Sequence, residues 1–216
     1  DVCSSDLFCC GFSMNAAALA QPEGGETERF LKEVAEGLGI WILAGVPERR
    51  QGQALNNALL VSPEGVIHRF TKLHPFSFAG EHRHYGRGDT CCTWDVEGVR
   101  ITPFICYDLR FPEEFRQTAE QTDVFVVIAN WPEARRLHWS TLLRARAIEN
   151  IAYVLGVNRV GEGGGLQYAG DSAAIEPRGE VLASAAAQEA VLLVEVDPAR
   201  VASVRAAFPA LSDRRR

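Results

Sequence analysis

The chain of 216 residues is 47% hydrophobic and 23% charged, a composition typical of a globular protein with a sizeable core. Its formal net charge of −6 argues against a broad nucleic-acid-binding surface. No stretch of about 18 apolar residues is present, and no charged segment leads into a short apolar one. We therefore expect a cytoplasmic protein with no membrane-spanning segment or signal peptide, folded as a single domain over residues 1–216.

The cysteine pattern argues against a disulfide scaffold. Six cysteines occur, at positions Cys3, Cys9, Cys10, Cys91, Cys92 and Cys106. Two pairs are adjacent in sequence, no CxxC motif is present, and a chain of this size needs no disulfide staples. No grouping of cysteines and histidines has zinc-ligand spacing, so we expect free thiols in a reducing compartment and no metal site.

The first half of the chain predicts one helix followed by strands. Residues 26–39 carry apolar side chains at helical spacing and end in a glycine, which is typical of a helix stop. The apolar run 40–48 predicts a buried strand, and 56–72 predicts a strand, a turn and a second strand. Residues 73–88 show no regular period and are expected to form a loop.

The second half alternates between predicted strands and helices. Strands are expected at 91–96, 99–106, 123–130, 152–160, 172–177, 181–183 and 191–196. Helices are expected at 111–121, 139–151 and 198–207, and a flexible loop at 161–165. This alternation, with hairpins mixed in, predicts layered α/β architecture rather than a doubly wound sheet.

The strongest chemical signal of a single residue is Cys106, at the carboxyl end of an apolar strand. Open α/β folds place their functional sites at such strand ends. A thiol there can attack a carbonyl carbon if a base removes its proton and donors stabilise the oxyanion. From the strand alone, a small buried core cysteine is the alternative interpretation.

Two further positions carry weaker signals. Lys72 lies between a strand and the irregular segment, where a solvated lysine is the ordinary outcome. Glu81 is followed by His82, His84 and Tyr85, and the paired histidines raise a metal site as an alternative. No third ligand follows at a suitable spacing, which argues against the metal.

Taken together, these segments resemble the nitrilase superfamily of carbon–nitrogen hydrolases, most closely its omega-amidase branch. Matching stretches occur in the family's order: GFSMNA at 11–16, RFTKLHPF at 69–76, GEHRHYGRGD at 80–89, ICYDLRFPE at 105–113, ANWPEAR at 129–135, LLRARAIENIAYVLGVNRVG at 142–161 and YAGDSAAIEPRGE at 168–180. The resemblance runs from about residue 7 to the end of the chain. It implies a nitrilase-like α-β-β-α sandwich that lacks the family's first strand and helix, and a homodimer.

The resemblance also implies a mechanism. Cys106 would attack an amide carbonyl, expel ammonia and leave a thioester that water hydrolyses. Lys72 would stabilise the oxyanion together with the backbone N–H of Tyr107. Glu81 would orient the lysine, and no metal or organic cofactor is implied.

The general base departs from the family pattern. A glutamate is expected in a Pro-Glu stretch before Leu7, but this chain has Ser5 and Asp6 at those positions. Aspartate is one methylene shorter, and a displacement of about 1 Å can lower a rate roughly a hundredfold. Asp6 also lies close to a chain end, where backbones fray unless a sheet holds them. We therefore expect residues 1–6 to be atypical or foreign and Asp6 to be poorly positioned as a base.

Three residues are candidates for substrate binding. Arg110 could clamp a substrate carboxylate, although an ion pair with Glu113 or Glu149 is the favoured alternative. Trp131 and Phe78 could line the pocket, with a core position as the alternative for each.

The function implied is hydrolysis of the terminal amide of a small 2-oxo acid amide, 2-oxoglutaramate or 2-oxosuccinamate, to the carboxylate and ammonia. Another amidase or carbamoylase of the superfamily is the second interpretation. A catalytically impaired fragment, in which Asp6 replaces the glutamate base, is the third.

Overall fold

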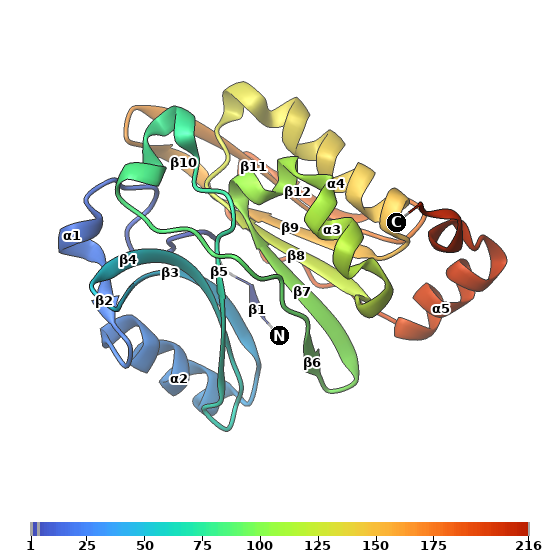
Figure 1. Ribbon diagram of the computed structural model, residues 1–216, viewed down its shortest axis with the longest axis horizontal. Helices are drawn as coiled ribbons and strands as arrows, with labels where there is room; N and C mark the ends of the chain where they lie inside the picture. The colour runs from blue at the N-terminus through green and yellow to red at the C-terminus, as the bar shows by residue number, and fades with distance from the viewer. Residues whose placement is uncertain (1, 4, 216) are drawn as a thin grey trace.

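The computed structural model describes residues 2–3 and 5–215 as two β-sheets packed face to face between layers of helices (Figure 1). The strands are β1 Val2–Cys3, β2 Gln21–Pro22, β3 Ile42–Arg50, β4 Gln53–Val61, β5 Ile67–Thr71, β6 Trp94–Val96, β7 Val99–Ile105, β8 Val124–Ala129, β9 Tyr153–Asn158, β10 Val160–Gly163, β11 Leu166–Ile175 and β12 Val181–Ala186. The α-helices are α1 Ala16–Leu19, α2 Glu26–Leu38, α3 Pro112–Thr118, α4 Arg136–Asn150 and α5 Pro198–Ala207. Short 3-10 helices lie at Ser77–Ala79, Glu81–Arg83, Cys106–Arg110, Ala119–Gln121, Glu133–Arg135 and Ala210–Asp213.

The first sheet has the strand order β1-β3-β4-β5, with β2 also paired to β3. Side chains of β3 alternate between its two faces, as strand geometry requires. Ile42 and Ala44 pack against Leu31 of α2 on the outer face, whereas Leu43 points into the core between the sheets. The predicted helix at 26–39 is confirmed, and its final glycine, Gly39, takes the left-handed conformation that ends the helix.

The second sheet has the order β10-β11-β9-β8-β7-β6, with β12 paired to β11. Strands β7, β8 and β9 are parallel neighbours, so their carboxyl ends meet at one edge of the sheet. Helices α3 and α4 cover the outer face of this sheet (Figure 1). The arrangement is an α-β-β-α sandwich, which confirms the predicted fold class.

The core between the sheets is aromatic and aliphatic. Phe70 of β5 meets Phe104 of β7 edge-on, with ring centroids 5.8 Å apart, and Phe104 stacks on Phe115 of α3 at 4.0 Å. These rings join the two sheets and the outer helix into one hydrophobic cluster. Burial of such rings is the main source of stability for the layered arrangement.

Two sequence-based predictions of elements are wrong. Residues 191–196 form no strand, and Val191 and Leu193 are 84% and 89% exposed. Alternating apolar residues indicate that one face can be buried, but a strand also needs a neighbouring edge to bond, and within the described residues none pairs with this segment. The segment 161–165 is not merely a flexible loop, because β10 pairs with β11 in a hairpin there.

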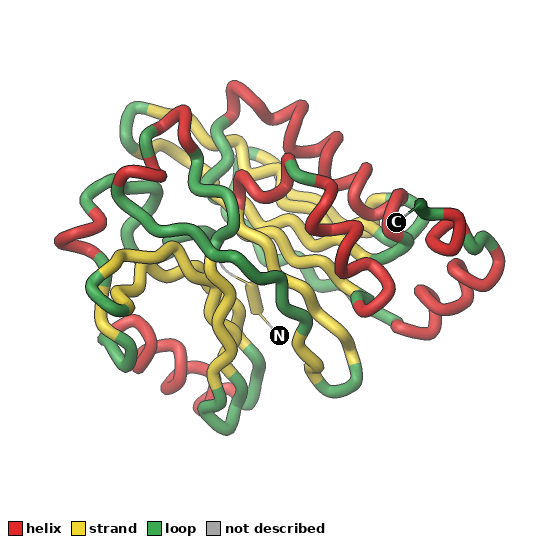
Figure 2. The backbone as a smooth tube through the Cα atoms, in the orientation of Figure 1, coloured by secondary structure: helices red, strands yellow, loops and turns green. Residues whose placement is uncertain are grey.

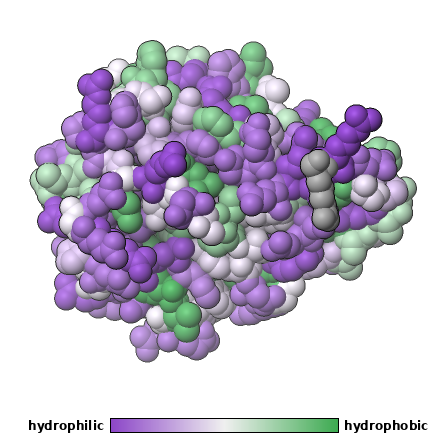
Figure 3. All heavy atoms as spheres, in the orientation of Figure 1, coloured by the Kyte–Doolittle hydropathy of each residue, from purple (hydrophilic) through white to green (hydrophobic). Residues whose placement is uncertain are grey.

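The long connection between β5 and β6 is drawn in Figure 2 largely as loop with short helical turns. It holds the two 3-10 helices Ser77–Ala79 and Glu81–Arg83, which the absence of a regular period did not predict. Polar side chains predominate on the face shown in Figure 3, with apolar side chains in small groups. No helix within the described residues is long and apolar enough to cross a membrane.

Candidate active site

Cys106 lies directly after β7, at the sheet edge where the carboxyl ends of the parallel strands meet. Its backbone φ of 49° falls in the left-handed region, which a non-glycine residue adopts only at a cost. The residue is 8% exposed, and burial raises the pKa of its thiol to about 12, although Lys72 acts to lower it. The thiol is therefore protonated at neutral pH and needs a base to become a nucleophile.

Lys72 and Glu81 form a buried ion pair beside Cys106. The lysine Nζ lies 3.0 Å and 2.8 Å from the two carboxylate oxygens of Glu81, and both side chains are fully buried. Burial alone would lower the pKa of Lys72, but the charges of Glu81 and Cys106 raise it above its ordinary value. The ammonium group therefore stays charged at neutral pH, within electrostatic range of Cys106.

Glu81 is held by two further donors. The amide of Asn56 on β4 donates to one carboxylate oxygen at 3.1 Å, and the backbone N–H of Phe76 donates to the other at 2.6 Å. A carboxylate with this many donors keeps one orientation. Asn56 was not predicted from the sequence, because an asparagine inside an apolar strand carries no signal of its partner.

Asp6 is fully buried next to these groups. Burial raises the pKa of its carboxyl to about 7, while the positive charge of Lys72 acts to lower it. Within the described residues, neither carboxylate oxygen has a hydrogen-bond partner. A carboxyl that titrates near neutral pH is suited to accept a proton.

The expectation that Asp6 lies on a frayed end is wrong. Strand β1 pairs in parallel with β3, the Phe8 N–H donates to the Gly45 carbonyl at 2.9 Å, and the Asn130 amide donates to the Asp6 carbonyl. The approach of this segment to β3 requires glycine, because an added Cβ at Gly45 would lie 2.7 Å from the Asp6 Cα. Sheet pairing holds Asp6 in place, which its position near a chain end could not show.

Asp108 connects the lysine segment to the nucleophile. Its carboxylate accepts the backbone N–H of Ile105 at 3.1 Å and that of His74 at 2.8 Å, and lies 3.0 Å from the His74 ring nitrogen. Burial acts to lower the pKa of His74 and Asp108 acts to raise it, and the net direction is upward. One carboxylate thus bridges the residue before Cys106 and the segment after Lys72.

The remaining predicted residues occupy different surroundings. Tyr107 follows the nucleophile, and its ring lies 4.8 Å from that of Phe76. Trp131 is 3% exposed and its indole N–H donates to the Arg135 carbonyl at 2.9 Å, whereas Phe78 is 86% exposed.

Arg110 makes neither of the ion pairs considered from the sequence. Its guanidinium lies 4.9 Å from the Trp131 ring centroid and 3.0 Å from a ring nitrogen of His138. Within the described part of the chain, Glu149 pairs instead with Arg146 at 2.9 Å and with Arg116 at 3.9 Å.

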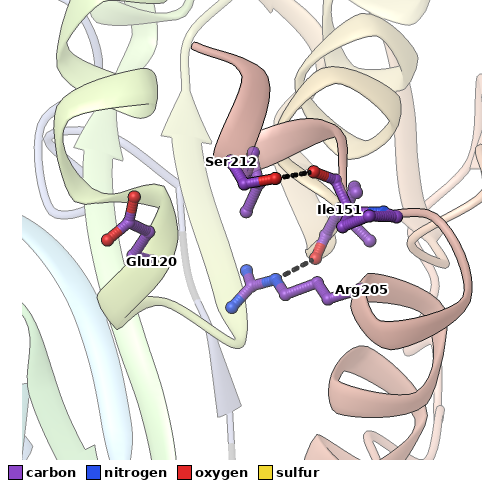
Figure 4. A pocket seen from close by; sticks show the side chains of 6 residues that line it. Glu120, Ile151, Arg205 and Ser212 are labelled. Atoms are coloured by element: carbon purple, nitrogen blue, oxygen red, sulfur yellow. Dashed lines mark hydrogen bonds between the residues drawn. The ribbon is translucent and has the colours of Figure 1, made fainter. Parts of the chain in front are cut away.

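A hollow of about 390 Å³ lies elsewhere, beside α5 (Figure 4). Arg205 reaches into it but already donates to the carbonyls of Ile151, Ala119 and Thr122 at 3.0, 2.8 and 2.7 Å. This arginine is a structural anchor of the C-terminal helix, and the hollow contains none of the clustered titratable residues. No group of three or more His, Cys, Asp or Glu side chains among residues 2–3 and 5–215 is arranged to hold a metal ion.

The family model for carbon-nitrogen hydrolases matches residues 2–206 of this chain. The chain belongs to the carbon–nitrogen hydrolase family. Within this family, the chain is 41% identical to the omega-amidase YafV of Escherichia coli over 96% of its length and 81% of the relative. It is 34% identical to the 2-oxoglutaramate amidase of Bacillus subtilis, over 98% of this chain and 83% of that one. These similarities place this carbon–nitrogen hydrolase in the omega-amidase branch of the nitrilase superfamily, and it is an amidase.

Solved structures of the family agree with the fold. A CN-hydrolase superfamily protein from Xanthomonas campestris, whose structure carries an arsenic adduct in the active site, superposes with a TM-score of 0.95 at 38% identity. That comparison covers 100% of this chain and 85% of the other. The Saccharomyces cerevisiae protein Nit3, at 24% identity over 97% of this chain and 81% of its own, shares the fold with a TM-score of 0.87.

Proposed function

We propose that this carbon–nitrogen hydrolase cleaves the terminal amide of a small 2-oxo acid amide, 2-oxoglutaramate or 2-oxosuccinamate, to the 2-oxo dicarboxylate and ammonia. The observation that carries the proposal is the meeting of Lys72, Asp6 and Glu81 around Cys106, whose thiol pKa responds to all three charges. The names of two relatives, an omega-amidase and a 2-oxoglutaramate amidase, support the choice of substrate.

In the first half-reaction, the Asp6 carboxylate accepts the Cys106 thiol proton while the sulfur attacks the amide carbon. The carbonyl π electrons move to oxygen, and the tetrahedral intermediate then collapses as its C–N bond breaks. Asp6 returns the proton to the departing nitrogen, so ammonia leaves and a thioester remains. In the second half-reaction, Asp6 deprotonates water, which attacks the thioester carbon. The C–S bond then breaks, and the proton passes from Asp6 to sulfur to restore the thiol.

The oxyanion formed in both half-reactions is stabilised by Lys72 and by the backbone N–H of Tyr107. Lys72 is suited to this role because Glu81 holds its ammonium group charged and oriented in a buried position. Electrostatic stabilisation is large in such a water-excluded site, and removing one oxyanion donor from an enzyme costs roughly a hundredfold or more in kcat. Glu81 orients the lysine, and these steps use only side chains, backbone and water.

The decisive measurement is ammonia release from 2-oxoglutaramate by the parent chain, the Asp6→Glu variant and the Cys106→Ala variant. We expect release by the parent chain and none above background from Cys106→Ala. If neither the parent chain nor Asp6→Glu exceeds the Cys106→Ala background, the proposed activity is wrong.

The shorter carboxylate favours a second candidate, a chain with impaired catalysis. Among the described residues, no donor lies in ideal hydrogen-bond geometry to the Asp6 carboxylate, although Lys72 and the Asn56 side chain both act to lower its pKa. A rate for Asp6→Glu well above that of the parent would support impairment. A thiol-reactive probe that labels Cys106 no faster than Cys91, whose thiol pKa burial raises to about 11, would support an inactive chain.

The same proposal includes a cytoplasmic homodimer. Leu137 and Ile148 on α4 are 72% and 51% exposed, which supports an association through the outer helical layer. Sedimentation at micromolar concentration should give twice the mass of the 23.7 kDa chain, and a monomer would contradict this part of the proposal.

A further inference from the structure

Besides Arg110, two arginines near Cys106 have no carboxylate partner among the described residues. Arg135 ends the 3-10 helix that follows β8, and Arg159 comes directly after β9. Because β7, β8 and β9 are parallel neighbours, the segments after them share the sheet edge of Cys106. Both arginines are half-buried, and no ion pair joins either to an acidic side chain within residues 2–3 and 5–215.

Arg135 packs on aromatic side chains next to the Lys72–Glu81 ion pair. Its guanidinium carbon is 5.4 Å from the ring centroid of Phe76. The Phe76 ring lies 4.8 Å from the ring of Tyr107, and its backbone N–H donates to Glu81. An aromatic face can orient a guanidinium without neutralising its charge, so Arg135 keeps its positive charge beside the site.

Arg159 follows β9 and packs against the neighbouring strand β11. Its guanidinium carbon lies 4.6 Å from the ring centroid of Tyr168 on β11. A Cβ added at Gly11 would lie 2.9 Å from the Arg159 Nη1, so this group rests against the turn that follows Asp6. That turn is closed by the Gly11 N–H, which donates to the Leu7 carbonyl at 2.8 Å.

Tyr168, whose ring contacts Arg159, is also affected electrostatically by Arg135 and by the groups around Cys106. Burial raises the pKa of Tyr168, and the charges of Cys106 and Asp6 act in the same direction. The charges of Arg159 and Arg135 act to lower the same pKa. The hydroxyl therefore lies within electrostatic range of the nucleophile, the base and both guanidinium groups.

We propose that Arg135 and Arg159, together with the Tyr168 hydroxyl, bind the carboxylate at the far end of a linear amide substrate. This inference rests on the proposed function and assigns its substrate preference to named residues. Guanidinium groups match carboxylates in geometry and charge, and both of these are oriented by aromatic rings and free of acidic partners within the described chain. Arg110, the arginine first considered for this role, also lies over an aromatic ring, that of Trp131, but differs in that a guanidinium nitrogen lies 3.0 Å from a ring nitrogen of His138, whereas the Arg159 side chain donates, among the described residues, only to a backbone carbonyl, that of Glu162.

The test compares glutaramate with valeramide, which carries a methyl group in place of the carboxylate. We expect Arg135→Gln and Arg159→Gln each to raise KM for glutaramate about 10- to 100-fold, as loss of a hydrogen bond to a charged group implies. The value of kcat should change little, and kcat/KM for valeramide should stay unchanged. Tyr168→Phe should give a smaller rise in KM for glutaramate alone.

Arg136→Gln is the matched control, because this neighbouring arginine is exposed and already paired with Asp171 at 2.8 Å. Arg136→Gln should leave KM and kcat for both substrates unchanged. Equal losses on both substrates in Arg135→Gln and Arg159→Gln would overturn the subsite, and so would a selective loss in Arg110→Gln with none in the other two.

A binding measurement separates this inference from the proposed activity. Calorimetric titration of the Cys106→Ala variant with glutarate needs no turnover. Binding that is lost on adding Arg159→Gln and kept on adding Arg136→Gln supports the subsite even if 2-oxoglutaramate is not cleaved. Absence of glutarate binding, or equal binding in all three variants, contradicts it.

Discussion

The two sheets supply chemically different halves of the active site. The first sheet places the charged groups: Asp6 runs beside β3, Lys72 follows β5, and Glu81 lies in the next connection. The second sheet places the neutral nucleophile Cys106 after β7 and the amide of Asn130 after β8. The buried charges of the first half must be paired, as Lys72 and Glu81 are, because an unpaired buried charge is costly. In the second half, burial only raises the pKa of the Cys106 thiol.

This difference shows that reactivity arises at the interface between the sheets. In the proposed mechanism, the thiol gains its base and its oxyanion donor from the opposite half. Hydrogen bonds near Cys106 cross that interface: Asp108 accepts the His74 N–H at 2.8 Å, and Asn130 donates to the Asp6 carbonyl. Alignment of the halves should therefore matter as much as the identity of the reacting groups.

The largest expected effect comes from removing the Cys106 thiol, the neutral group of the second half. Cys106→Ala should abolish ammonia release, by at least about a thousandfold, because no other group can form the thioester. Its unfolding free energy should stay close to that of the parent chain, since an unpaired thiol is replaced by a smaller apolar group. Cys92→Ala, a half-buried cysteine away from the catalytic groups, is the control and should keep full activity. Residual activity within tenfold of the parent would show that the nucleophile is misassigned.

Breaking the charged half should cost stability as well as rate. Lys72→Met leaves Glu81 buried without its cation, which should destabilise the fold by about 3–5 kcal/mol and remove activity. Adding Glu81→Leu should restore much of the stability but no activity. The control is Lys32→Met, because the Lys32–Glu28 pair at 3.3 Å is 42% exposed at the lysine and should contribute less than about 1 kcal/mol. Equal unfolding midpoints for Lys72→Met and Lys32→Met in urea would contradict this prediction.

Loosening the link between the halves should mainly lower kcat. Asp108→Asn replaces two acceptors for backbone N–H groups by one, and we expect a loss in kcat of about a hundredfold from misalignment, with a smaller change in KM. Asp123→Asn is the control, because that carboxylate accepts the Arg100 backbone N–H at 3.0 Å away from the catalytic cluster. Both variants should lose stability, but only Asp108→Asn should lose kcat. Steady-state kinetics and urea denaturation distinguish them.

The smallest effect should be seen in pH dependence. Burial raises the pKa of Asp6 to about 7, so kcat/KM should rise through that pH and fall about tenfold below its plateau at pH 6. The contribution of Asp6 to the free energy of unfolding changes with pH in the opposite direction. The folded carboxyl binds its proton more tightly than an ordinary aspartate, whose pKa is 3.8, so its contribution to stability declines as pH rises from 3.8 to about 7. Asp6→Asn should remove that decline, and a flat rate profile between pH 6 and 8 would argue against Asp6 as the base.

Sequence patterns predicted most elements and singled out the candidate catalytic residues. The helical stripe of residues 26–39 and the nucleophile motif around Cys106 are local signals, and the structure places both as expected. The strand predicted at 191–196 failed because pairing depends on a neighbouring edge rather than on periodicity. The proposed catalytic roles of Lys72 and Glu81 came from a family resemblance and stay predictions, as does the atypical nature of residues 1–6.

The sequence by itself determined where the longer helices lie and which side chains can carry chemistry, because the hydrogen bonds of a helix and the type of a side chain are local properties. Only the tertiary structure decided that Asp6 is buried and held by β3 and that Asp108 joins the two halves. It also decided that Arg135 and Arg159 rest on aromatic rings, whereas His138 engages Arg110. The physical reason is that the pKa of Asp6, the hydrogen bonds of Asp108 and the surroundings of the two arginines all depend on atoms from strands far apart in the chain. Their positions are set when the two sheets pack, and no single segment contains them.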